Sequence, residues 1–203
     1  MTVAMGLSLT GCSSQPGATA GAETAVVADT GSQTVTGTAP ASRNSFPSIV
    51  VLEPIGEAML SSQATTPAMD QEQQTFVPSI LLVRTGQPVN FLNHDDVLHN
   101  VRVRDDETKE SAFNVAIPTG ETYTHTFTRN GFYDVGCDIH PGMSAQIIST
   151  SSPYTVLADA GGAFSIPDVP NGPYKAIAYS GADTITREIN VAAGAAAVDL
   201  SRP

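Results

Sequence analysis

This sequence is poor in aromatic residues, basic residues and long apolar runs. It contains no tryptophan, and aromatic residues make up only 6% of its 203 positions. Nine lysines and arginines stand against twenty aspartates and glutamates, so the net charge is −11 at pH 7. Nucleic-acid binding requires a basic face, and this charge argues against it. No segment reaches the roughly 18 consecutive apolar residues of a membrane-spanning helix.

Metal-binding residues are also scarce, with two cysteines and four histidines in the whole chain. Cys12 lies near the start and Cys137 in the second half, and nothing in their contexts suggests a disulfide. A structural zinc site usually takes four cysteine or histidine ligands, and a methionine in the set would be a poor choice for zinc.

One short stretch nevertheless concentrates the side chains that bind soft metals. Cys137, His140 and Met143 place a thiolate, an imidazole and a thioether within seven residues. Thiolate with imidazole suits copper or zinc, and a weak axial thioether indicates copper. Such a site needs a second histidine from elsewhere, and we expect His99 to supply it.

The alternation of side chains in strands supports this set, because residues two apart share a face. Three segments would direct apolar residues inward and carry a ligand at one end. The inward sets are His99, Val101 and Val103; Tyr133, Val135 and Cys137; and Met143, Ala145 and Ile147. By the same rule Asn100, Arg102 and Arg104 would face water.

Each candidate ligand has an alternative interpretation. His94, five residues before His99, is its rival, but it lies in a polar turn and we expect it to be exposed to solvent. Cys137 would otherwise be a buried free thiol, and Met143 an ordinary core methionine. His125 alternates with aromatic residues and reads as a packed strand residue rather than a ligand.

Turn-forming clusters recur every 8–12 residues, which is typical of an all-β sandwich. Residues 54–74 show no clear period, with one helical turn at 56–63 and a loop at 65–74 as the best interpretation. The predicted strands of the central region are 46–52, 76–84, 88–93, 98–104, 112–116, 122–128, 131–137 and 143–149.

Taken together, these motifs resemble the cupredoxin family over about residues 46–149. The resemblance is carried by His99-Asn100-Val101, then Gly131-Phe132-Tyr133, then the Cys-x-x-His-x-x-Met spacing of a short ligand loop like that of amicyanin. It implies a Greek-key β-sandwich over residues 46–150 with one mononuclear type 1 copper held by His99, Cys137, His140 and Met143. It also implies that Asn100 ties the two ligand segments together.

The resemblance implies a one-electron carrier with a transient redox partner rather than an enzyme. Multicopper oxidases and copper nitrite reductases carry a histidine beside the copper cysteine or further histidines for a second copper, whereas Gly136 and Asp138 flank Cys137 here. Two alternatives remain: a cell-surface binding or scaffold protein with structural copper, and a copper-handling protein. A reversible redox couple would distinguish the carrier from the scaffold.

The N-terminal region reads as a membrane anchor and spacer. Leu9-Thr10-Gly11-Cys12 resembles the lipobox of bacterial lipoproteins, which implies cleavage before Cys12 and its acylation. Residues 1–12 lack a basic segment, so we expect the true start to lie upstream; the alternative is a free thiol at Cys12. Residues 13–45, rich in Ala, Thr, Gly and Ser, would form a disordered tether. The expected location is the periplasm or the bacterial cell surface.

Residues 151–203 form a separate unit in this interpretation. The run from Asp159 to Tyr174 resembles the carboxypeptidase regulatory-like (transthyretin-like) β-sandwich module. With about 50 residues the unit would be marginal alone. We therefore expect it to pack against the copper domain or to borrow a strand from it.

Overall fold

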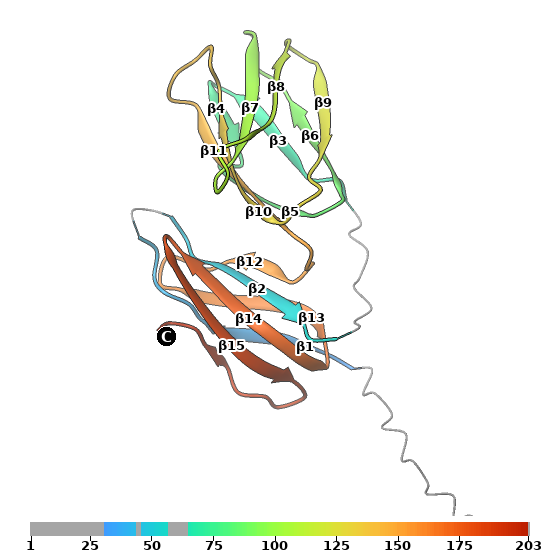
Figure 1. Cartoon of the computed structure of the whole chain (residues 1–203), viewed down its shortest axis with the longest axis vertical. Coiled ribbons are helices and arrows are strands. Elements are labelled where there is room, and N and C mark those ends of the chain that lie inside the picture. The colour runs from blue at the N-terminus through green and yellow to red at the C-terminus, as the bar shows by residue number, and fades with distance from the viewer. Residues whose placement is uncertain (1–30, 44–45, 57–64, 203) are drawn as a thin grey trace, which may run out of the picture.

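The computed structural model describes residues 31–43, 46–56 and 65–202, and these residues form sixteen β-strands. The described residues contain no α-helix, and so no helix capable of crossing a membrane. The strands gather into two bodies, one above the other in Figure 1. The predicted all-β class, with more than one sheet, is confirmed.

The first body is a two-sheet sandwich built from β3 to β11. A five-stranded sheet runs in the order β5-β11-β10-β7-β8, and a four-stranded sheet in the order β4-β3-β6-β9. The strands are β3 (Ala68–Glu72), β4 (Thr75–Val77), β5 (Ile80–Arg84), β6 (Pro88–Leu92), β7 (His99–Asp105), β8 (Ser111–Ile117), β9 (Thr122–Thr126), β10 (Gly131–Gly136) and β11 (Ser144–Thr150).

Period-two alternation fills the core between these sheets. In β7, Val101 and Val103 are fully buried while Arg104 is exposed, and in β10 Tyr133 and Val135 point into the same core. Two predictions were wrong here. Residues 65–74, expected to be a loop, contain β3, which pairs in parallel with β6 and antiparallel with β4. Asn100, expected to face water, is buried.

The second body is a seven-stranded sandwich with a three-stranded and a four-stranded sheet, ordered β13-β1-β16 and β12-β2-β14-β15. Its core includes Val50, Leu52, Phe164 and Tyr174. The strands are β1 (Ser32–Thr38), β2 (Ile49–Pro54), β12 (Thr155–Leu157), β13 (Ala163–Pro170), β14 (Gly172–Ser180), β15 (Asp183–Val191) and β16 (Val198–Asp199).

This sandwich is discontinuous in sequence, and the predicted domain boundaries need correction. Residues 13–45 were expected to be a disordered tether, yet β1 lies within them and pairs with β13 and β16. The copper domain was expected to begin at 46, yet β2 pairs with β12 and β14. The first sandwich is therefore inserted between β2 and β12 of the second. The small C-terminal unit gains β1 and β2 from the N-terminal side, which supplies the core that residues 151–203 lack.

Strand β2 also joins the two bodies, because it is buried on both faces. Val50 and Leu52 point into the second sandwich, whereas Ile49 and Val51 pack with Ile148 of β11. Partly buried residues complete this apolar contact, and the rings of Phe132 and Tyr179 meet edge to face with centroids 5.3 Å apart. Burying apolar surface between the bodies stabilises a fixed relative orientation.

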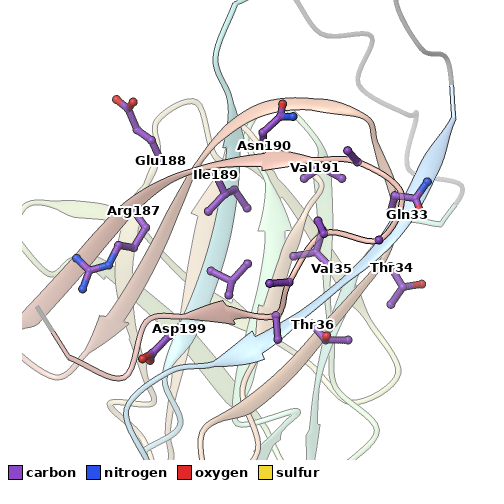
Figure 2. Close-up of a pocket in the computed structure, with 16 residues that line it drawn as sticks. Gln33, Thr34, Val35, Thr36, Arg187, Glu188, Ile189, Asn190, Val191 and Asp199 are labelled. Carbon is purple, nitrogen blue, oxygen red and sulfur yellow. The ribbon is translucent and has the colours of Figure 1, made fainter.

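The second sandwich has a cavity of about 370 Å³ at one side (Figure 2). Val35 and Val191 are buried core residues in its lining, and the Ala-rich segment after β15 lies along it. The residues that line it include none of the four predicted metal ligands. These ligands belong to the first sandwich, since all four fall between the start of β7 and the start of β11. The predicted helical turn at 56–63 lies outside the described residues except for residue 56.

Candidate metal centre

The predicted ligands meet at one end of the five-stranded sheet. His99 is the first residue of β7, Cys137 directly follows β10, and Met143 directly precedes β11. Strand β10 pairs antiparallel with both β7 and β11, with Gly136 opposite Arg102 on one side and Ser144 on the other. The sheet register therefore brings three separate segments to one edge.

Three donor atoms converge there. The Sγ of Cys137 lies 3.9 Å from Nδ1 of His99 and 4.0 Å from Nδ1 of His140, and the two Nδ1 atoms are 2.9 Å apart. An ion bound at about 2.0–2.3 Å from thiolate and imidazole holds its donors within about 4 Å of one another. His99 and Cys137 are buried and His140 is half-buried. One thiolate and two imidazoles at this spacing fit a single soft or borderline metal ion.

The loop from Cys137 to Met143 is closed by its own backbone. The N–H of Cys137 donates to the carbonyl of Met143 at 3.4 Å, and the N–H of Met143 donates to the carbonyl of His140 at 3.3 Å. The N–H of His140 donates to the Cys137 sulfur at 3.4 Å. Gly142 adopts a φ of 107°, which favours glycine. The side chain of Met143 is buried in the same core cluster as Cys137.

Asn100 connects the two ligand segments, in agreement with the role implied by the family resemblance. Its Oδ1 accepts the N–H of Asp138 at 2.7 Å and that of Ile139 at 3.2 Å, and it lies 3.3 Å from the Cys137 sulfur. Its Nδ2 donates to Asn114 at 2.8 Å. Because Asn100 directly follows His99, this side chain fixes the position of β7 relative to the Cys137 loop.

Asp138 anchors the other side of that loop. Its carboxylate accepts from Nδ2 of Asn114 at 3.0 Å and pairs with Nε of Arg102 at 2.7 Å. The Asn114 hydrogen bond is the main cause that lowers the pKa of Asp138, and the charge of Arg102 adds to it. The residue beside the cysteine is therefore held in place by side chains from both β7 and β8.

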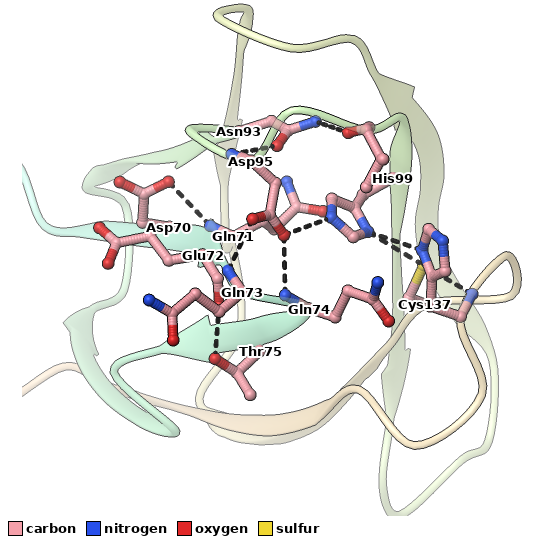
Figure 3. A network of polar contacts seen from close by, with 12 residues as sticks. Asp70, Gln71, Glu72, Gln73, Gln74, Thr75, Asn93, Asp95, His99 and Cys137 are labelled. Carbon is pink, nitrogen blue, oxygen red and sulfur yellow. Dashed lines mark hydrogen bonds and ion pairs between the residues drawn. The ribbon is translucent and has the colours of Figure 1, made fainter.

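Sequence reasoning missed Asp95, which holds the buried imidazole of His99 (Figure 3). The Asp95 carboxylate lies 2.8 Å from Nε2 of His99 and accepts the backbone N–H groups of Gln73 and Gln74 at 2.6 and 2.7 Å. The Gln74 hydrogen bond is the main cause that lowers the pKa of Asp95. A charged carboxylate accepts a hydrogen bond from the N–H at Nε2, which leaves the lone pair of Nδ1 facing Cys137 and His140. The Asp-x-x-x-His spacing was the available signal.

The other two histidines lie elsewhere. His94 is exposed, and its Nδ1 contacts the carboxylate of Asp70. His125 lies in β9 among aromatic rings, with centroids 4.6 Å from Phe113 and 4.9 Å from Phe127. Burial lowers the pKa of His125. The geometry thus places His99, and not its rival His94, beside Cys137 and His140.

Comparison with known proteins agrees with this site. Residues 63–149 match the family model of copper binding proteins, plastocyanin/azurin family. Among solved structures the chain resembles amicyanin from Paracoccus versutus, at 21% identity over 44% of this chain and 85% of that one, with a TM-score of 0.39. It also resembles a purple cupredoxin from Nitrosopumilus maritimus, at 23% identity over 41% of this chain and 99% of that one, with a TM-score of 0.38. A search of curated proteins finds no match.

The family match and the geometry define the class of site together. The matched segment covers the first sandwich almost completely and includes all four predicted ligands. Residues 63–149 therefore match a copper-binding family, and the donor set they carry is that of one mononuclear type 1 copper. The resemblance of the second sandwich to a regulatory-like module has no counterpart in these comparisons and stays a prediction.

Proposed function

We propose that this protein is a one-electron carrier whose copper is held by His99, Cys137 and His140, with Met143 as a weak axial donor. The observation that carries the proposal is the convergence of one thiolate and two imidazoles within 4.0 Å, beside a buried methionine. Copper bound by such a set exchanges one electron between Cu(I) and Cu(II).

The surrounding residues restrict movement of the donors, which is what electron exchange requires. His99 is held by Asp95, and the Cys137 loop is held by Asn100 and by its own backbone. Donors fixed in this way keep nearly the same positions in both oxidation states, so little rearrangement accompanies each transfer. The buried setting also limits access of water to the thiolate.

His140 is the proposed point of electron exit. It is the one imidazole of the pair that is not fully buried, and exposed apolar side chains lie beside both histidines in sequence. Leu98 and Ile139 expose 47% and 45% of their surfaces, and Val97 exposes 37%. Exposed apolar residues next in sequence to the ligands suit the small, short-lived contact typical of redox partners.

We propose no substrate chemistry for this site, so the protein is not an enzyme in this interpretation. Three of the four proposed ligands are buried, and only His140 reaches the surface. A substrate would need an open position at the metal, whereas this geometry supports outward contact only through an imidazole edge.

We further propose that Cys12 is acylated and attaches the protein to a membrane in the periplasm or at the cell surface. The support is the lipobox-like Leu9-Thr10-Gly11-Cys12, which lies outside the described residues. The second sandwich would then be a regulatory-like module between the anchor and the copper domain. Cys12→Ala, expressed with a complete leader, should move the protein out of the membrane fraction. Wild-type protein that is soluble and unmodified at Cys12 would contradict this.

Copper reconstitution tests the central proposal. The oxidised protein should show an intense blue or green colour from thiolate-to-copper charge transfer, and a redox titration should give one reversible one-electron couple. Cys137→Ala should be colourless. A colourless Cu(II) complex of the wild type would refute type 1 copper, and a coloured protein with no reversible couple would favour the scaffold alternative.

A further inference from the structure

We propose that Asp70, Glu72 and His94 form a second metal site, separate from the copper centre, for a divalent transition-metal ion of the zinc or copper(II) type. One ligand atom from each of the three side chains lies within 4.8 Å of those of the other two. The chemistry is that of an imidazole with two carboxylates rather than of an acidic patch. The site goes beyond electron transfer and does not depend on it.

Two different segments build this cluster. Asp70 and Glu72 are two apart in β3 and share the outer face of the strand, while Gln71 between them is fully buried. Figure 3 shows both carboxylates on one side of the strand, away from His99 and Cys137. His94 follows β6, the strand that pairs in parallel with β3. The convergence is therefore fixed by the sheet.

Backbone contacts preorganise the cluster further. The N–H groups of His94 and Asp95 both donate to the carbonyl of Gln71, at 3.2 and 3.1 Å. The N–H of Gln71 donates to Oδ1 of Asp70 at 2.8 Å, which leaves Oδ2 to contact His94. The buried Gln71 side chain donates to the Leu92 carbonyl at 2.8 Å and holds β3 against β6.

The local charge favours a cation at this position. Asp70 contacts His94, whereas the ion pairs of Arg43, Arg102, Lys109 and Arg129 go to other carboxylates. The exposed carboxylate of Glu72 belongs to the same cluster. Two carboxylates beside one imidazole therefore favour a bound cation.

The donor set selects the class of ion. Imidazole suits zinc, copper and nickel, whereas calcium and magnesium prefer all-oxygen sites. The imidazole of His94 is exposed and also borders an open hollow of about 530 Å³, whose lining is Gln73, Gln74, His94, Asp95, Asp96 and Val97. A hydrated ion can therefore approach freely, and water can complete its coordination. This accessibility contrasts with the buried donors of the copper centre.

Zinc titration of the full-length protein tests the proposal. Calorimetry on Cys137→Ala, whose copper centre lacks its thiolate, should show one saturable Zn²⁺ site per chain, and histidine-ring NMR should show the largest shift at His94. His94→Gln and Asp70→Asn should each weaken this binding by about tenfold or more, since even loss of an outer-shell partner costs that much. The matched control is Asp96→Asn, which removes a neighbouring exposed carboxylate and should leave the affinity within about twofold.

Contrary results are equally clear. Absence of saturable Zn²⁺ binding would overturn the site, and so would an equal loss of affinity in His94→Gln and Asp96→Asn, which would indicate diffuse attraction to an acidic surface. A largest NMR shift at His99 or His140 would assign the ion to the copper centre instead. If Asp70→Asn unfolds, Glu72→Gln, at an exposed position, replaces it.

Discussion

The carboxylate of Asp95 lies 2.8 Å from Nε2 of the buried His99 and also accepts the two backbone N–H groups of the turn between β3 and β4. One side chain therefore links a ligand of the copper centre to the opposite sheet. Both turn residues, Gln73 and Gln74, have positive φ angles, so the turn benefits from an acceptor that fixes it.

Removing this carboxylate should weaken copper binding. Asp95→Ala frees the His99 ring to rotate and to change tautomer, and we expect about a 10- to 100-fold loss of copper affinity. Competition with a chelator would measure it. Asp96→Ala, at the next and exposed position, is the control and should bind copper as the wild type does. Equal affinities in both variants would show that Asp95 does not position His99.

Met143 should tune the copper rather than hold it. An axial thioether is long and weak, so Met143→Leu should keep both copper and colour, with a raised reduction potential. Met143→Gln should lower the potential, since an oxygen donor favours the oxidised ion. His99→Ala removes an equatorial donor instead and should change the spectrum outright. Loss of copper from Met143→Leu, or an unchanged potential, would refute the axial role.

Because the second sandwich includes β1, N-terminal truncation should lower the stability of the protein. A chain that begins at residue 46 lacks β1, which pairs with β13 and β16, and exposes the core around Phe164 and Ile166. It should unfold at a lower denaturant concentration than a chain that begins at residue 31. Equal midpoints and equal slopes in the two chains would mean that β1 contributes nothing to the fold.

Gly37 provides a point test of the same strand. A Cβ at this position would lie 2.1 Å from the Val198 carbonyl oxygen and 2.6 Å from the Phe164 ring. Gly37→Ala should therefore lower the free energy of unfolding by about 1–3 kcal/mol, the usual range for overpacking. Thr36→Ala, next to it in β1, is the control. Chemical denaturation of both variants would show whether the contact between β1 and β16 is as close as described.

His125 should give the protein an acid-sensitive stability. Burial lowers its folded-state pKa below the ordinary value of 6.5, so the unfolded chain binds the proton more readily. Stability should be unaffected by this group well above pH 6.5 and should fall as the pH drops from 6.5 towards the lowered pKa. His125→Phe removes the effect and should flatten that part of the profile. If the free energy of unfolding changed with pH in the same way for both proteins between pH 5 and 8, the prediction would be wrong.

Local sequence determined the central part of the candidate site. Cys137, His140 and Met143 belong to one short loop, so their proximity follows from spacing alone. Strand alternation also indicated that His99 points inward. Period-two patterns at β7 and β10 predicted most of the core of the first sandwich, because a half-buried strand must alternate its side chains.

Tertiary structure alone decided which strands belong to which sandwich. Strand β1 lies in a Ser- and Thr-rich segment with few apolar residues, and its partner β13 begins more than 120 residues later. Strand β2 reads as the start of the copper domain because it is adjacent in sequence, yet its apolar residues on both faces serve the second sandwich and the contact between the two bodies. Such pairings depend on distant partners that no local pattern encodes.

The same reason separates the ligands from the residues that support them. The copper loop contains three of the ligands within seven residues, so its chemistry can be read from spacing. Three other features exist only once β3, β6 and β7 are brought together. They are the hydrogen bond between Asp95 and His99, the burial of Asn100, and the contact of His94 with Asp70. The sequence determined which atoms can bind a metal. The fold determined which of them meet, because hydrogen bonds and packing between sheets fix their positions.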